Sequence, residues 1–261
     1  MRLGLRGSDY SCEVMDLQIK VVKDYGEMSK VAADLVECFM RKHPAAVLGL
    51  ATGSTPIGLY EELVQRHRAG LDFSRVITFN LDEYYGLANN HPASYHYYMQ
   101  EHLFQHINVS PENIHIPNGA NADAAEECRS YEAKIVSADG IDLQILGIGS
   151  NGHIGFNEPG SSFGGTAGLV NLAPATIEAN SRFFDKQEDV PRQALSMGIK
   201  SIMNCRKIVL LANGENKAEA IARAVEGPIT EALPASVLQL HPDCTFVLDE
   251  GAAKKLTPPS R

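Results

Sequence analysis

The sequence predicts an α/β protein with an open, mainly parallel, doubly wound (Rossmann-like) sheet and helices on both faces. Short, nearly continuous apolar runs alternate with longer segments whose apolar residues recur at the three-to-four spacing of an amphipathic helix. Strands that are apolar on both faces are typical of a parallel sheet that helices cover on each side. No internal repeat of roughly 20 to 50 residues is visible in the sequence.

The expected elements follow in order after Met15. The apolar run 17–22 predicts a strand, and apolar residues at helical spacing between Met28 and Met40 predict the first helix. A strand at 45–50 comes next, followed by a helix that opens at Pro56, a residue suited to the first turn. Beyond these, we expect strands at 76–80, 141–148, 207–212 and 245–248, and helices at 94–104, 122–136, 194–203, 217–225 and from Pro234 onward.

Length and composition indicate one soluble domain. The chain has 261 residues, a size that a single α/β domain reaches, and we expect residues 15–261 to form that domain. Residues 1–14 are expected to be a disordered extension or a misassigned beginning before Met15. No apolar run approaches the roughly 18 residues of a membrane span. A net charge of −9 argues against broad binding to nucleic acid or to anionic membranes, so an anionic ligand would need a local basic site.

The cysteines are scattered, odd in number and without paired spacing. This pattern fits a reducing cytosol better than a disulfide framework or a zinc site, so a cytoplasmic location is expected. Cys38 falls on the apolar stripe of the first helix and is expected to be buried. None of the five is given a functional role: Cys12, Cys38, Cys128, Cys205 and Cys244.

The turn after the strand at 45–50 combines small and hydroxyl-bearing residues. Gly53 allows a tight turn, Ser54 and Thr55 offer hydroxyl and amide groups, and Pro56 begins a helix. The amino end of a helix attracts phosphate, and in an open parallel sheet ligands gather at such strand ends. Phosphate binding and simple helix capping remain equally open from these residues alone.

Two adjacent acids, Asp82 and Glu83, follow the strand at 76–80. Neighbouring side chains on an extended chain point in opposite directions, so we expect one acid to face the site and the other to cap or bind a neighbour. The alternative is a solvated acidic pair.

The loop after the strand at 141–148 carries His153 and Glu158 among several glycines. A single histidine is more often structural than catalytic, but small residues around it and a nearby carboxylate favour a functional site. The carboxylate can fix the tautomer of the imidazole and raise its basicity.

From Met15 onward the chain resembles the glucosamine-6-phosphate deaminases of the glucosamine/galactosamine-6-phosphate isomerase family. The related 6-phosphogluconolactonases share the fold and a Gly-His loop, but the ending at 156–159 and the Asp82–Glu83 pair resemble the deaminase branch. The resemblance rests on several motifs in the same order: LGLATGSTP at 48–56, FNLDEY at 79–84, LGIGSNGHIGFNEP at 146–159, NSRFF at 180–184 and GENKA at 214–218.

The resemblance implies conversion of α-D-glucosamine 6-phosphate and water to fructose 6-phosphate and ammonia, in amino-sugar catabolism, without a metal or organic cofactor. It implies that Asp82 moves a proton from the second sugar carbon to the first, and that His153, supported by Glu158, assists opening of the ring. The phosphate would be held by Gly53, Ser54, Thr55, Arg182 and Lys217.

The chain departs from some family members at two places. Asn151 stands where some relatives carry Asp, which assigns the chain to the branch with Asn in this loop; Asn can orient an imidazole but cannot balance its charge. Gly168, Leu169 and Val170 replace the basic residues that allosteric hexamers use to bind N-acetylglucosamine 6-phosphate. Allosteric activation is therefore expected to be absent or weak, in a monomer or small homo-oligomer.

Residues 160–190, here called the lid segment, suit either a mobile lid or a surface excursion, and the resemblance favours a lid that carries Arg182. The aromatic and imidazole residues between His91 and Tyr98 are expected to pack a helix against the sheet. Two rival functions remain from the sequence. One is a 6-phosphogluconolactonase-like hydrolase, and the other is a non-catalytic sugar-phosphate sensor.

Overall fold

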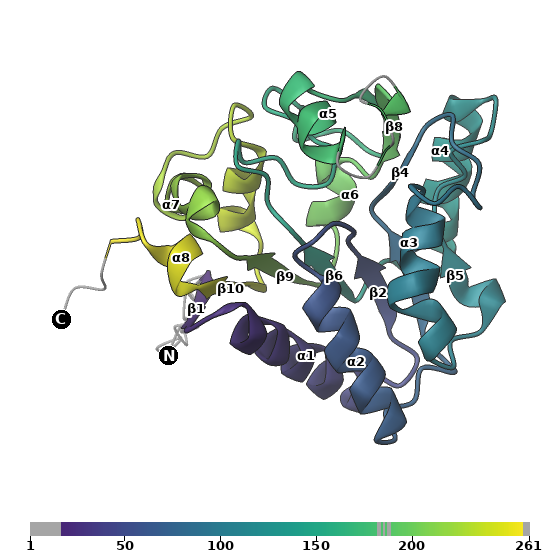
Figure 1. Cartoon of the computed structure of the whole chain (residues 1–261), viewed down its shortest axis with the longest axis horizontal. Coiled ribbons are helices and arrows are strands. Elements are labelled where there is room, and N and C mark those ends of the chain that lie inside the picture. The colour runs from purple at the N-terminus through teal and green to yellow at the C-terminus, as the bar shows by residue number, and fades with distance from the viewer. Residues whose placement is uncertain (1–16, 182–183, 185, 187–188, 258–261) are drawn as a thin grey trace, which may run out of the picture.

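A seven-stranded parallel sheet forms the centre of the computed structural model, which describes residues 17–181, 184, 186 and 189–257 (Figure 1). Its strand order is β1-β10-β9-β6-β2-β3-β5, and every neighbouring pair is parallel. The predicted α/β class is therefore confirmed. The strands are β1 Gln18–Val22, β2 Val47–Leu50, β3 Ile77–Asn80, β5 Ile114–His115, β6 Leu143–Leu146, β9 Lys207–Ala212 and β10 Cys244–Asp249.

Helices connect these strands, and α1 and α2 pack side by side against the sheet in Figure 1. Asp24, Ser94 and Asp123 each cap a helix by accepting a hydrogen bond from a backbone N–H of its first turn. The α-helices are α1 Tyr25–Lys42, α2 Ile57–Arg68, α3 Tyr95–His102, α4 Ala124–Ser137, α5 Pro174–Asn180, α6 Ile199–Met203, α7 Ala218–Glu226 and α8 Glu250–Ala253. The 3-10 turns are η1 Phe104–His106, η2 Pro111–Asn113, η5 Glu215–Lys217 and η6 Pro234–Leu240.

A second, three-stranded antiparallel sheet was not expected from the sequence. It joins β4 Asp82–Tyr84, β8 Gln193–Ser196 and β7 Gly168–Asn171, and it lies in the upper part of Figure 1 with α5. The predicted helix at 194–203 is therefore wrong in its first part. Residues 193–196 pair with β4 on one side and β7 on the other, and Gly198 separates them from α6. The lid segment likewise contains β7 and α5 instead of being wholly irregular.

Two smaller features differ from the sequence predictions, and two predictions fall on residues that the structure does not describe. The short elements β5 and α8 were not predicted, because two to four residues give too little periodicity. Cys38 is exposed, so its predicted burial is wrong: α1 turns this thiol away from the core. The predicted extension at 1–14 and Arg182 lie outside the described residues.

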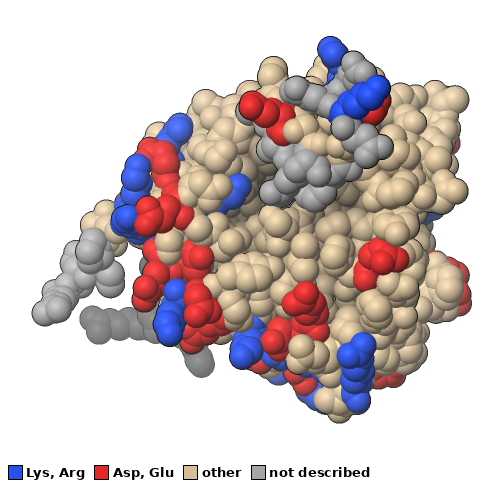
Figure 2. Space-filling model, in the orientation of Figure 1, with Lys and Arg blue, Asp and Glu red and all other residues tan. Residues whose placement is uncertain are grey.

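Charged side chains avoid the middle of the face shown in Figure 2 and gather along its left and lower margins. Many are paired with the opposite sign, as in the 2.8 Å contacts of Lys254 with Glu215 and of Lys255 with Glu219. Within the described part of the chain, no helix has the length and apolar character needed to cross a membrane.

Candidate active site

The two adjacent acids after β3 have different neighbours, as predicted. Glu83 is buried, and its carboxylate accepts hydrogen bonds from the backbone N–H groups of Tyr95 and His96. The same carboxylate lies 2.8 Å from Nδ1 of the His96 ring. Glu83 therefore binds the first turn of α3, where a negative charge also interacts favourably with the helix dipole. Its role is to connect β4 to α3, which leaves Asp82 as the acid available for chemistry.

Asp82 is only 6% exposed and lies beside the loop that follows β6. A Cβ placed on Gly155 would sit 3.6 Å from Oδ2 of Asp82, an ordinary van der Waals distance, so this loop lies against the Asp82 carboxylate. The φ of Gly155, 56°, is what favours glycine there. Burial, assisted by the neighbouring Glu83 carboxylate, raises the pKa of Asp82 to about 8. An acid with this pKa can both accept and release a proton near neutral pH.

His153 stands on a tight loop that closes on itself after β6. The N–H of Gly149 donates to the carbonyl of His153 at 2.9 Å, and the N–H of Gly152 donates to the carbonyl of Gly149 at 3.0 Å. The imidazole packs directly over Gly149, where a Cβ would approach Cε1 and Nδ1 of the ring to 2.4 Å. Gly149 is therefore required for this ring position, because any larger residue would displace the imidazole.

The half-buried carboxylate of Glu158 contacts three neighbouring side chains. Oε2 accepts a hydrogen bond of 2.7 Å from Nδ2 of Asn151 and lies 3.4 Å from Nδ1 of His153, close enough for an ion pair but not aligned as a hydrogen bond. Oε1 accepts a hydrogen bond from the hydroxyl of Thr176. Burial favours the neutral acid, but the contacts with His153, Thr176 and Asn151 outweigh it and lower the pKa of Glu158 to about 2.

Asn151 does not hydrogen-bond to the imidazole that the sequence suggested it would orient. Its Oδ1 accepts a hydrogen bond from the backbone N–H of His153 at 3.2 Å, while its Nδ2 donates to Glu158. Asn151 therefore fixes the backbone at His153 and the carboxylate beside the ring, and it has no hydrogen bond to the imidazole itself.

The turn after β2 meets the turn after β9. Gly53 has a φ of 98°, a conformation that favours glycine. The hydroxyl of Thr55 donates to Oδ1 of Asn213 at 3.2 Å, which joins this turn to the one that carries Lys217 in η5. Ser54, in the turn after β2, is exposed. Gly53, Ser54, Thr55 and Lys217 are thus on neighbouring turns at the carboxyl edge of the sheet.

Three tyrosines from three helices support the turn after β2 by donating their hydroxyls to its carbonyls. Tyr60 donates to the carbonyl of Ala51, Tyr98 to that of Gly53 at 2.6 Å, and Tyr25 to that of Ser54 at 3.2 Å. Among the described residues, no acceptor receives a hydrogen bond from the backbone N–H groups of 53–55. The carbonyls of this turn therefore accept hydrogen bonds from the three tyrosines, whereas its amide groups remain available to bind an anion.

Sequence reasoning missed these tyrosines as well as Thr176 and Asn213. Tyr98 belongs to the aromatic cluster for which packing was expected, and packing is confirmed for its neighbour Tyr95, whose ring stacks on Phe156. No motif signals the missed contacts, because they join residues of different segments, from 9 residues apart for Tyr60 and Ala51 to 158 for Thr55 and Asn213.

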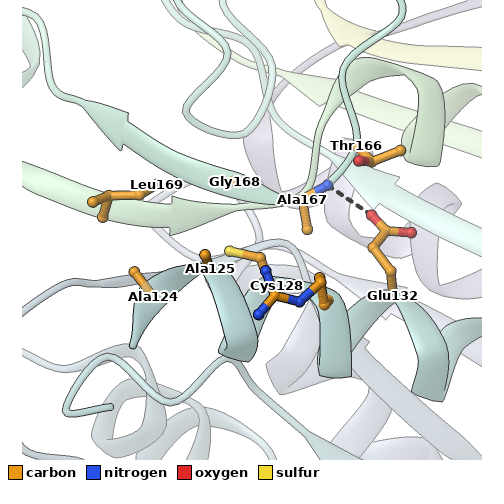
Figure 3. A pocket seen from close by; sticks show the side chains of 9 residues that line it. Ala124, Ala125, Cys128, Glu132, Thr166, Ala167, Gly168 and Leu169 are labelled. Atoms are coloured by element: carbon orange, nitrogen blue, oxygen red, sulfur yellow. Dashed lines mark hydrogen bonds between the residues drawn. The ribbon is translucent and has the colours of Figure 1, made fainter. Parts of the chain in front are cut away.

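A cavity of about 590 Å³ lies elsewhere, between α4 and the beginning of β7 (Figure 3). Glu132 stands at its edge and accepts a hydrogen bond of 2.7 Å from the N–H of Ala167. The cavity has neither Asp82 nor His153 in its lining, so its size does not make it the reaction site. Among the described residues, no three His, Cys, Asp or Glu side chains are grouped to hold a metal ion.

Comparison with known proteins gives a consistent family. The model of the family described as glucosamine-6-phosphate isomerases/6-phosphogluconolactonase matches residues 26–247. A glucosamine-6-phosphate deaminase from Thermoanaerobacter pseudethanolicus is 55% identical over 238 residues, which cover 91% of this chain and 94% of that protein. One from Clostridium novyi is 54% identical over 92% of this chain and 100% of its own length.

Solved structures give the same picture. A structure described as a monomeric glucosamine-6-phosphate deaminase superposes with a TM-score of 0.90 at 45% identity, covering 92% of this chain and 100% of its own. A 6-phosphogluconolactonase from Trypanosoma brucei superposes with a TM-score of 0.78 at 19% identity, covering 93% and 99%. The second similarity is one of fold alone.

Proposed function

Because this chain belongs to the family of glucosamine-6-phosphate isomerases and 6-phosphogluconolactonases, we propose that it is an enzyme that converts glucosamine 6-phosphate and water to fructose 6-phosphate and ammonia. The observation that carries the proposal is that two carboxyl groups with opposite tendencies are placed at the loop after β6: Asp82 lies against Gly155 of this loop, and Glu158 belongs to it. Asp82 has a pKa raised to about 8, and Glu158 has one lowered to about 2. Such a separation of pKa values is typical of sites that divide acid and base duties.

Asp82 would perform the isomerisation. In the open-chain sugar it would take the proton from the second carbon as the electrons move toward the aldehyde, and it would return that proton to the first carbon. One proton of the substrate ammonium group passes to the aldehyde oxygen, so the first carbon becomes a CH2OH group and the second an iminium group. Water adds to the iminium carbon, a proton moves from the added water to the nitrogen, and ammonia departs as the ketone forms, with one proton released. The positive ammonium group of the substrate favours ionised Asp82 on binding, while the raised pKa favours capture of the proton.

His153 would open the pyranose ring by moving a proton between the ring oxygen and the hydroxyl of the first carbon. The ionised Glu158, 3.4 Å from Nδ1, stabilises the imidazolium form that arises during this step. Asn151 and Thr176 hold Glu158 by hydrogen bonds, so the carboxylate stays beside the ring.

The phosphate would bind the turn of Gly53, Ser54 and Thr55 together with Lys217 and Arg182. Backbone N–H groups at the start of α2 and a neighbouring lysine supply the positive potential that a dianion needs in a chain of net charge −9. Arg182, outside the described residues, would come from the lid segment.

The proposals for oligomeric state and cellular location rest on similarity to relatives. A relative with a TM-score of 0.90 is described as monomeric, and Gly168, Leu169 and Val170 offer an effector phosphate no charge. We therefore propose a monomer or small homo-oligomer without allosteric activation, acting in the cytoplasm, with residues 160–190 as a lid.

The test is a comparison of two substrates. Purified protein should release ammonia and fructose 6-phosphate from glucosamine 6-phosphate, and it should not accelerate hydrolysis of 6-phosphogluconolactone. Lactone hydrolysis without ammonia would instead indicate the lactonase, and binding of either sugar phosphate without turnover would indicate a sensor.

A further inference from the structure

We propose that Thr176 is a positioning residue for ring opening, whose hydroxyl holds Glu158 in the orientation that serves His153. The inference rests on the proposed function, because it assigns Thr176 a part in the same site. Thr176 lies in the first half of α5 and is only 7% exposed. It has no counterpart among the motifs that carry the family resemblance.

The geometry fixes the Glu158 carboxylate from two sides. The Thr176 hydroxyl donates to Oε1, and Nδ2 of Asn151 donates to Oε2 at 2.7 Å. With one donor on each oxygen, the carboxylate cannot rotate about its last bond without losing a hydrogen bond to a charged acceptor. Oε2 is thereby kept facing Nδ1 of His153, at 3.4 Å.

The hydroxyl also joins two parts of the chain that are separate in sequence. Glu158 belongs to the loop after β6, whereas Thr176 reaches it from α5, beyond β7, in the lid segment. The beginning of that segment is tied down independently, by hydrogen bonds from Gly160 to the carbonyl of Glu231 at 2.7 Å and from Ala167 to Glu132. The position of α5 therefore decides whether Glu158 has its second donor.

The electrostatic consequence is specific to this carboxylate. Burial favours the neutral form of Glu158, and the hydrogen bond from Thr176 is one of the interactions that reverse this tendency and lower its pKa. Among the described residues, His153 is the titratable group in contact with Glu158. Without the hydroxyl, Glu158 should take up a proton at higher pH than in wild type, and its carboxylate should lose the fixed orientation toward Nδ1 of His153.

The first experiment compares Thr176→Val, which keeps the shape but removes the hydroxyl, with Thr176→Ser, which keeps the hydroxyl. Thr166→Val is the matched control, since Thr166 is exposed in the same segment. With glucosamine 6-phosphate, Thr176→Val should lower kcat about tenfold, the loss expected for one hydrogen bond to a charged group, with KM unchanged. Thr176→Ser and Thr166→Val should match wild type.

A purely structural threonine would leave kcat of the folded protein and the pKa of Glu158 in place even if the protein melted at a lower temperature. An unchanged kcat in Thr176→Val, or equal impairment of Thr176→Ser, would overturn the proposal.

A second measurement needs no substrate and separates this inference from the proposed function. The carboxyl carbon of Glu158, followed by NMR during an acid titration, should report a higher pKa in Thr176→Val than in wild type or Thr176→Ser. Wild-type protein that releases no ammonia would refute the deaminase, and the titration would still decide the role of Thr176. Identical titrations would refute it.

Discussion

At the scale of single residues, the donors around each carboxylate decide what that carboxylate can do. Glu83 and Glu158 accept several hydrogen bonds each, whereas no described residue donates one to the side chain of Asp82. A buried carboxylate without donors favours its protonated form, and one with several donors stays ionised. Of Asp82 and Glu158, Asp82 is therefore the one able to exchange a proton at neutral pH.

This environment predicts that Asp82→Asn makes the protein more stable at high pH. The folded-state pKa of about 8 exceeds the value near 4 of an unfolded chain, so wild type loses stability as pH rises from about 4 to about 8. Asparagine does not titrate and escapes this loss. Chemical denaturation should give Asp82→Asn a gain of about 1 to 3 kcal/mol at pH 8 and a smaller one at pH 5. An equal difference at both pH values would contradict the raised pKa.

At the scale of elements, the turn between β2 and α2 depends on helices that come from distant parts of the sequence. The place of the turn was predictable from Gly53 and Pro56, because both residues have strong backbone preferences. Its support was not, since Tyr98 is 45 residues from the carbonyl that it holds. The same limit applies to Thr176 and Glu158, which are 18 residues apart on different elements.

Removing one support should weaken phosphate binding. Tyr98→Phe loses the hydrogen bond to the carbonyl of Gly53, so the amide groups of the turn are less well fixed for an anion. We expect KM for glucosamine 6-phosphate to rise about threefold to tenfold while kcat changes by less than about twofold. Tyr97→Phe is the matched control, because Tyr97 is 40% exposed on the same helix. Equal KM values for the two variants would refute this role.

At the scale of the whole molecule, the sequence predicted the main sheet but not the small one. Six of the seven parallel strands were predictable from apolar runs between amphipathic helices, and the two-residue β5 was not. The residues of this sheet belong to the main hydrophobic core. The strands of the small sheet have three or four residues each, and Asp82 pairs with Ser196 across more than a hundred residues of chain. No local pattern reveals such a pairing. Because this sheet positions Asp82, the surroundings of Asp82 could not be predicted from the sequence, although the residue itself was.

The whole-molecule prediction concerns assembly and regulation. Without charged residues at 168–170, an effector phosphate has no partner there, so saturation with glucosamine 6-phosphate should be hyperbolic. N-acetylglucosamine 6-phosphate should change the half-saturation concentration by less than about twofold. Light scattering after gel filtration should give a mass near the 28.4 kDa chain or a small multiple of it. Sigmoidal curves relieved by the effector would contradict the prediction.

Release of ammonia from glucosamine 6-phosphate through Asp82 is tested most directly by assaying wild type and Asp82→Asn side by side. Wild type should produce equal amounts of ammonia and fructose 6-phosphate. Asp82→Asn should retain a folded structure but lose about a thousandfold in kcat, the effect of removing a general base. No ammonia from wild type, or undiminished ammonia from Asp82→Asn, would contradict the account.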